Sequence, residues 1–173
     1  MADIHQLSLG GFSQRIAKPS PIWAGGSVLA ITSSNAWSLL EMVAGLAHRL
    51  QPDADLAHII DVARAHRQDL IQWAEDDAMA MKAALAEFNS EAIRTIVAVP
   101  LKIVTDAAQG YRFTRHPAVV AYRPAALDLS CARALFHSVH DAGRAIVLEN
   151  VQALDTESRA QALDRLATIS IEK

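Results

Sequence analysis

Residues 55–87, DLAHIIDVARAHRQDLIQWAEDDAMAMKAALAE, carry the clearest periodic pattern of the chain and decide its fold class. Apolar side chains recur there in steps of three and four, which is the spacing of one face of an α-helix. The positions on this stripe are Leu56, Ile60, Ala63, Arg67, Leu70, Ala74, Asp77, Met81 and Ala84. The spacing predicts one long helix from about Asp55 to Glu87 with a single packed face.

Two charged residues, Arg67 and Asp77, occupy positions of this stripe where an apolar residue is expected. A carboxylate on a packed face must find a partner, take up a proton or serve a site, because a lone buried charge is costly. We therefore keep two interpretations of Asp77. It is either half of a salt bridge between helices, with Arg67 of another chain as the partner, or a functional carboxylate.

The segment before this helix predicts a second long helix over about 26–48. Small residues crowd its first half, and they let another helix or a ligand approach the backbone closely. Its expected core residues are Val28, Ile31, Leu39, Met42, Val43 and Leu46. Residues 1–23 form a lead-in interrupted by glycine and proline, with room for a short helix around Phe12 and Ile16.

Downstream of residue 87 the pattern predicts shorter helices. The expected segments are a helix after Asn89 that contains Pro100, an irregular connection over 110–123, a helix from Pro124 to Ala142, a shorter helix after Gly143 to Asn150, and a last helix from about Asp155 to Thr168. These bounds rest on caps, on proline in a first turn and on glycine at a helix end. The proline inside the third helix removes one backbone hydrogen-bond donor.

The composition fits a single helical domain. The chain has 173 residues, of which 51% are hydrophobic and only 5% aromatic, a length that supports one sizeable core. We predict one all-α domain over residues 1–173, a bundle of five to six helices, two of them long. The two long helices expose more apolar surface than one chain can cover, so we expect the bundle to pack as a homodimer.

Charge and cysteine content exclude several classes of protein. A net charge of −3 with scattered basic residues gives no continuous cationic surface, so nucleic acid is not an expected partner. The most apolar stretch is interrupted by Asn35, Glu41 and His48, so no membrane span is expected. The single cysteine excludes an internal disulfide, and the N-terminus lacks the pattern of a secretory signal. We expect a cytoplasmic protein.

Several residues that could act as metal ligands or nucleophiles have simpler explanations. His137 and His140 stand beside Asp141, but no third ligand follows at motif spacing, so no metal is expected and a solvated helix face explains the group. The same interpretation covers three further histidines, His48, His58 and His66. Cys131 has no neighbours typical of an activated thiol, and we expect it in the core.

The Gly25-Gly26-Ser27 sequence opens the first long helix. Exposed backbone N–H groups at the positive end of a helix bind anions, and glycine permits close approach to them. A plain helix cap explains the same residues equally well. The pattern alone therefore leaves both interpretations open.

A series of short motifs runs along most of the chain. They are Ala17-Lys18-Pro19-Ser20-Pro21, Gly25-Gly26-Ser27-Val28, Met42-Val43, Asp77-Ala78-Met79-Ala80-Met81, Val99-Pro100-Leu101, Leu127-Asp128 and Val147-Leu148-Glu149-Asn150-Val151. In this order and approximate spacing they resemble the cyclodeaminase/cyclohydrolase family. That family includes the cyclodeaminase domain of formiminotransferase-cyclodeaminase and stand-alone methenyltetrahydrofolate cyclohydrolases.

The resemblance implies a dimeric all-α bundle that binds a tetrahydrofolate derivative as its substrate, without a metal, at a site that involves the subunit interface. The implied reaction is hydrolysis of 5,10-methenyltetrahydrofolate to 10-formyltetrahydrofolate, or the related ring closure that releases ammonia from the 5-formimino compound. The implied site residues are Asp77 as the base, Asp128 as a second acid, Gly25, Gly26 and Ser27 under the pterin, Asn150 as a hydrogen-bonding group, and Arg112 and Arg115 for the glutamate tail.

The chain departs from the family pattern in three places. Ile22 and Trp23 are inserted before Ala24, which replaces the first glycine of the turn, and Leu127 replaces a serine beside Asp128. The lysine-containing stretch that usually follows the Asp-Ala motif is missing. These changes favour an alternative function, that of a non-catalytic folate-binding or accessory subunit of a one-carbon enzyme complex.

Overall fold

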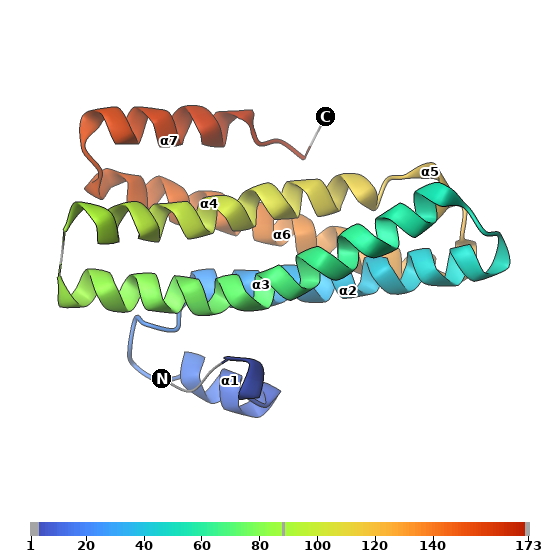
Figure 1. Cartoon of the computed structure of the whole chain (residues 1–173), viewed down its shortest axis with the longest axis horizontal. Coiled ribbons are helices and arrows are strands. Elements are labelled where there is room, and N and C mark those ends of the chain that lie inside the picture. The colour runs from blue at the N-terminus through green and yellow to red at the C-terminus, as the bar shows by residue number, and fades with distance from the viewer. Residues whose placement is uncertain (1–3, 88, 172–173) are drawn as a thin grey trace.

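Four long helices lie side by side along the long axis of the protein in the computed structural model (Figure 1). They are α2 (Gly25–Leu50), α3 (Ala54–Ala86), α4 (Ser90–Phe113) and α6 (Ala126–Asn150). Helix α2 packs on α3 and α6, and α4 packs on the same two helices. The structure describes residues 4–87 and 89–171.

Shorter elements flank this bundle. They are η1 (Ile4–Gln6), α1 (Leu9–Ile16), α5 (Pro117–Val120), η2 (Arg123–Ala125), η3 (Val151–Ala153) and α7 (Thr156–Thr168). In Figure 1, α1 lies below α3, and α7 lies above α4 on the opposite side. The described residues form seven α-helices and no strand, which confirms the all-α class. The predicted count of five to six helices differs because α1 and α5 are both helical, while the two helices predicted over 124–142 and 143–150 are one helix, α6.

Side chains at the helix starts explain where the chain turns. Asp53, Asn89 and Asp155 precede α3, α4 and α7, and each accepts a hydrogen bond from a backbone N–H of the following turn. Such caps satisfy donors that have no partner within the helix. Helix α2 differs, because the residue before it, Ala24, makes no side-chain cap.

The buried face of α2 is not the one that the large apolar residues predicted. Trp37 and Leu40 are fully buried, whereas Met42 is 41% exposed. Of the six expected core residues only Val43 is buried; the other four, Val28, Ile31, Leu39 and Leu46, are half-buried. The prediction is wrong because apolar residues occupy two adjacent faces of α2, and only the packing against α3 and α6 selects which face turns inward.

Two glycines that were expected at helix ends lie inside helices. In α4 the ring of Phe136 fills the space that a Cβ of Gly110 would need, and in α6 a Cβ on Gly143 would lie 2.6 Å from Cγ2 of Val104. Both glycines therefore allow close contact between α4 and α6. They serve helix packing and do not mark a turn. The predicted start of the connection at residue 110 and the predicted break after residue 142 are wrong for this reason.

The single cysteine lies on the surface. Cys131, predicted in the core, is exposed, while the next residue of α6, Ala132, is fully buried. One residue is 100° around a helix, so neighbours in sequence readily fall on opposite sides of a core boundary. Among the described residues no helix is long and apolar enough to cross a bilayer.

Candidate active site

Asp77 lies where α3 passes the first turn of α2. Its Oδ2 atom accepts a hydrogen bond from the Ser27 hydroxyl at 3.0 Å. A Cβ atom on Gly26 would overlap the carboxyl group of Asp77, so only glycine allows the carboxylate to lie this close to the α2 backbone. Gly25 is also confined, since its Cβ would lie 3.0 Å from the Ile146 side chain of α6. The structure thus brings Asp77 together with Gly26 and Ser27 of the Gly25-Gly26-Ser27 segment, here called the glycine turn, whereas Gly25 faces α6.

The first turn of α2 surrounds this carboxylate with positive potential. The first N–H groups of a helix lack partners within the helix, and the helix dipole adds a partial positive charge there. Because Ala24 provides no side-chain cap, the Asp77 carboxyl group from α3 occupies the place of a capping group. At the start of α2, the position where a helix binds an anion is therefore occupied by a carboxylate of the same chain, that of Asp77.

The carboxyl group of Asp77 has no cationic partner. Among the described residues no Lys, Arg or His nitrogen lies within 4.0 Å of it. Arg67, the other charge on the stripe, pairs with Glu41 of α2 at 3.0 Å within the same chain. Burial raises the pKa of Asp77 above its ordinary value of 3.8, and hydrogen bonds from the hydroxyl and backbone N–H of Ser27 oppose this shift. Such a group is suited to exchanging protons with a ligand.

Asp128 is not part of this cluster. It is exposed in the first turn of α6, and the adjacent Leu127 is 86% exposed. The residue of α6 that contacts the glycine turn is Ile146. At 1.5 Å per residue, Asp128 and Ile146 are about 27 Å apart along the helix. Within one chain the two predicted carboxylates do not meet.

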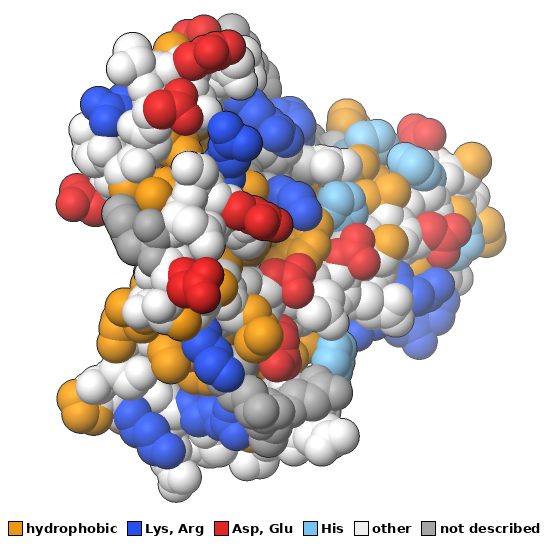
Figure 2. Space-filling view, turned by 60° about the vertical axis from the view of Figure 1, so that its left-hand side comes forward, with side chains coloured by type: hydrophobic (Ala, Val, Ile, Leu, Met, Phe, Trp, Pro, Cys, Tyr) orange, Lys and Arg blue, Asp and Glu red, His pale blue; other side chains and the backbone are white. Residues whose placement is uncertain are grey.

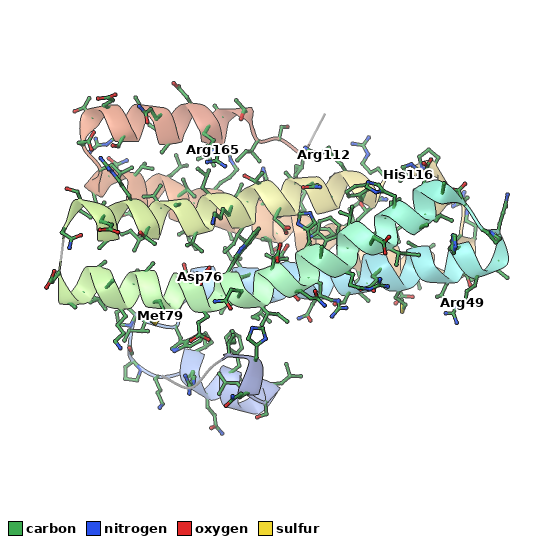
Figure 3. The ribbon with its side chains drawn as sticks, viewed as in Figure 1. Arg49, Asp76, Met79, Arg112, His116 and Arg165 are labelled. Atoms are coloured by element: carbon green, nitrogen blue, oxygen red, sulfur yellow. The ribbon has the colours of Figure 1, made fainter. Side chains whose placement is uncertain are left out.

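Arg112 and Arg115 are also far from Asp77 within one chain. Arg112 belongs to the last turn of α4 rather than to an irregular connection, and both side chains are exposed. Figure 3 shows Arg112 and His116 well along the bundle from Asp76, the neighbour of Asp77 on α3.

Asn150 has a structural partner on α4. Its side-chain amide donates a hydrogen bond to the backbone carbonyl of Ile96 at 2.7 Å. In a regular helix this carbonyl would accept from the N–H of residue 100, but Pro100 has no N–H. Asn150 therefore replaces the hydrogen bond that the proline removes.

A buried carboxylate in the middle of the bundle was not among the predicted site residues. Asp106 of α4 is 2% exposed and accepts hydrogen bonds from the Ser33 hydroxyl and the Trp37 indole, each at 2.8 Å, and from Nδ1 of His66. His66 also stacks on Trp37, with ring centroids 4.7 Å apart. The hydrogen bond to Asp106 raises the pKa of His66 above 6.5, against the effect of burial. The three side chains that donate to Asp106 come from α2 and α3, so this cluster joins three helices.

A signal for Asp106 was present in the sequence. Ile103, Asp106, Ala107 and Gly110 follow helical spacing, so an acidic residue stands on an apolar stripe as Asp77 does. The expectation that the helix gives way to a connection at residue 110 hid this pattern.

The histidines of α6 share one carboxylate. Asp141 accepts a hydrogen bond from Nδ1 of His140 at 2.9 Å, and Nδ1 of His137 lies 3.2 Å from its other carboxylate oxygen, within ion-pair distance. Among the described residues no group of three or more possible ligands is arranged to hold a metal ion.

Several surface grooves among the described residues are large enough for a small ligand, one of them a groove of about 590 Å³ beside Tyr111 and His137. Two others are larger and lie along α4. One of about 770 Å³ lies between α4 and α7, with Arg94 and Arg165 on its walls, and contains none of the predicted site residues. The other, of about 610 Å³, runs between α3 and α4, and its walls include Asp76 and Ala80, which flank Asp77 in sequence. Figure 2 brings this end of the bundle forward, where acidic and hydrophobic side chains lie interspersed. We favour the smaller groove of these two, because two residues of its walls, Asp76 and Ala80, lie within three residues of the half-buried Asp77 on α3.

Comparisons with known proteins agree on one relationship. The family model described as formiminotransferase-cyclodeaminase matches residues 8–168. The crystal structure of formiminotetrahydrofolate cyclodeaminase from Thermotoga maritima superposes with a TM-score of 0.87, at 22% sequence identity, over 95% of this chain and 88% of that chain. A search of curated protein sequences gave no match.

Proposed function

Because the chain belongs to the family described as formiminotransferase-cyclodeaminase, we propose that it is a cytoplasmic enzyme acting on a tetrahydrofolate that carries a one-carbon unit at N5 or between N5 and N10. The observation that carries the proposal is the half-buried Asp77 carboxyl group, held against Gly26 and Ser27 with no cation beside it in the described part of the chain. No metal takes part in this proposal.

The chemistry explains why such a carboxyl group is needed. In 5,10-methenyltetrahydrofolate the bridging carbon is part of a cationic amidinium, which a nearby carboxylate stabilises. When water adds to this carbon, Asp77 accepts one of its protons and a hydroxyl group remains on the carbon. As the carbon–N5 bond breaks, Asp77 passes its proton to N5, the hydroxyl releases its proton to solvent, and the formyl carbonyl of 10-formyltetrahydrofolate is formed.

In the related cyclodeamination the same carboxyl group would donate a proton instead of accepting one. N10 adds to the formimino carbon attached to N5, and the exocyclic nitrogen must be protonated before it leaves as ammonia. A carboxyl group with a raised pKa is a suitable donor for this proton. Three carboxylates on the walls of the adjacent groove, Asp76, Glu87 and Glu91, favour the cationic ring product over an anion.

The test is turnover by the purified protein. Methenyltetrahydrofolate absorbs light and its hydrolysis product does not share that band, so loss of absorbance measures hydrolysis, and gain of absorbance from the formimino compound measures cyclodeamination. Release of ammonia confirms the second reaction. Failure to change either substrate, under conditions where the protein is folded, would contradict the proposed activity.

A second candidate is a folate-binding or accessory subunit without activity. The inserted Trp23, directly before the glycine turn, is 7% exposed and packs edge-to-face on Phe12 of α1, with the Arg15 guanidinium 5.5 Å from its ring centroid. The turn is therefore tied to α1, which favours a changed ligand site. Calorimetric titration that shows folate binding, together with no turnover, would support this candidate.

We also propose that the protein is a homodimer. An apolar stripe on α2 remains partly uncovered: Met42 is 41% exposed, and Val28, Ile31, Leu39 and Leu46 are half-buried. A second copy would cover such a surface. Asp128, Arg112 and Arg115 enter the proposed site only if the second copy contributes them. Sedimentation should give twice the chain mass, and a monomer at micromolar concentration would contradict this arrangement.

A further inference from the structure

The Ser27 hydroxyl faces two hydrogen-bond acceptors but has only one hydrogen. Its Oγ atom lies 2.9 Å from the backbone carbonyl oxygen of Ala74 and 3.0 Å from Oδ2 of Asp77. Ser27 is fully buried, so water does not supply the missing partner. The carbonyl of Ala74 lies inside α3, where the N–H of the next turn also donates to it. The carbonyl therefore remains satisfied whether or not the hydroxyl points toward it.

Both protonation states of Asp77 fit these positions without movement of a heavy atom. When the carboxylate is ionised, the Ser27 O–H donates to Oδ2. When Oδ2 carries a proton, that O–H donates to Oγ of Ser27, and the hydroxyl hydrogen rotates toward the carbonyl of Ala74. In each state every hydrogen has an acceptor.

We propose that Ser27 is a positioning residue, whose hydroxyl turns between Asp77 and Ala74 as Asp77 gains and loses its proton. The inference rests on the proposed function for its effect on turnover, but the hydroxyl–carboxyl pair is a property of the resting protein. Hydrogen bonds to a charged acceptor are stronger than those to a neutral one. The hydroxyl therefore favours the ionised form, and its removal should raise the pKa of Asp77.

Few other groups near Asp77 titrate. On α3 the neighbour of Asp77 in sequence is Asp76, and α4 contributes Lys102, whose Nζ lies 6.0 Å from the ring centroid of Trp73, one turn before Asp77. From α2 the groups at the carboxylate are Gly26 and Ser27, and from α6 Ile146 packs beside Gly25; none of these side chains carries a charge. The hydroxyl of Ser27 is thus the side chain best placed to set the proton affinity of Asp77.

A matched pair of variants tests this role. Ser27→Ala removes the hydroxyl at Asp77. Ser34→Ala is the control, because Ser34 is also buried on α2 and donates at 3.0 Å to a backbone carbonyl of α3, that of Arg67, where no carboxylate is present. The readout is titration of the Asp77 carboxyl carbon by NMR, identified by its loss in Asp77→Asn. We expect a midpoint about one pH unit higher in Ser27→Ala and unchanged in Ser34→Ala.

Turnover gives an independent second readout. The limb of the pH–rate profile that reports ionisation of Asp77 should shift to higher pH by the same amount as the NMR midpoint. If Ser27→Ala does not fold, Ser27→Cys, with a weaker donor of similar size, should move the midpoint in the same direction by a smaller amount.

The outcomes separate this inference from the proposed function. A midpoint that moves in Ser27→Ala without turnover in any variant supports the role of Ser27 and contradicts the enzyme. Turnover with an unmoved midpoint contradicts the role of Ser27 and leaves the enzyme. An equal shift in Ser34→Ala would also overturn the inference, since the effect would then come from loosening the contact between α2 and α3.

Discussion

Two carboxylates inside this bundle, the buried Asp106 and the half-buried Asp77, are held in different ways. Asp106 accepts hydrogen bonds from Ser33, Trp37 and His66, and His66 can also balance its charge. Asp77 has the Ser27 hydroxyl and the start of α2, but no cation within reach among the described residues. A carboxylate with a full set of donors ties helices together. One that is buried and incompletely paired keeps a raised pKa and free capacity for a ligand.

The same substitution at the two positions should have opposite effects on stability, and this is the largest difference that we expect. Asp106→Asn places an NH₂ group among N–H and O–H donors and leaves the charge of His66 unbalanced, which should cost about 3 kcal/mol or more of unfolding free energy. Asp77→Asn removes a desolvated charge that has no cation, so stability should be kept or improved. Urea unfolding of both variants at pH 7 measures the difference. Equal losses would show that both carboxylates are structural.

The effects on activity should have the reverse order, with the larger loss in the Asp77 variant. Asn can neither accept a proton nor balance a cationic substrate, so Asp77→Asn should lower turnover about 100-fold or more, equivalent to about 2.7 kcal/mol in the barrier. Asp106→Asn, assayed below its unfolding temperature and corrected for the folded fraction, should keep most of its turnover. If Asp77→Asn reacts at the parent rate, the carboxyl group only caps α2.

The space around Asp77 gives a smaller and purely steric test. In Gly26→Ala the new methyl group would overlap the carboxyl group, so the side chain must shift, and we expect turnover to fall about tenfold. Gly45→Ala is the control on the same helix, because a Cβ there meets nothing within 4 Å and should stabilise α2 by about 0.5–1 kcal/mol. A fully active Gly26→Ala would mean that the close approach of Asp77 to α2 has no functional importance.

The smallest effects that we expect are on the pH dependence of stability. Asp77 and His66 should each change the unfolding free energy in a separate pH range. The folded-state pKa values of Asp77 and His66 both lie above their ordinary values, 3.8 and 6.5. Each group therefore contributes stability that is present below its ordinary pKa and is lost as the pH rises through the raised one. The Asp77 step should occur in the acidic range and the His66 step above 6.5. A tenfold difference in proton affinity between the folded and unfolded chains corresponds to about 1.4 kcal/mol of stability.

Single variants assign these two steps. The acidic step should vanish in Asp77→Asn, and the later step should vanish in His66→Gln, which keeps a donor near Asp106 but does not titrate. Thermal unfolding from pH 3 to pH 9 provides the measurement. A parent protein whose stability rises from pH 6.5 to pH 8, relative to His66→Gln, would contradict the ion pair at Asp106.

The sequence by itself determined the helical class, the positions of α2 and α3, and the presence of a carboxylate, Asp77, on an otherwise apolar stripe. Helical spacing is a local property, so a charged residue on an apolar stripe can be recognised without knowledge of its neighbours in space. The motif order likewise identified the family, and the family model over residues 8–168 confirms that resemblance. The start of α7 after Asp155 was predictable for the same local reason, since a cap acts within one turn.

Only the tertiary structure decided which groups meet. Gly110 and Gly143 break helices in many sequences, but here they admit Phe136 and Val104 from a facing helix, and periodicity carries no information about a facing helix. For the same reason His66 could not be assigned to Asp106, which is 40 residues away in the chain. Asp77 and Ser27 are separated by 50 residues, and they form a pair because α2 and α3 pack with their small residues in contact. Helix packing creates that proximity, and a pattern read along one helix does not contain it.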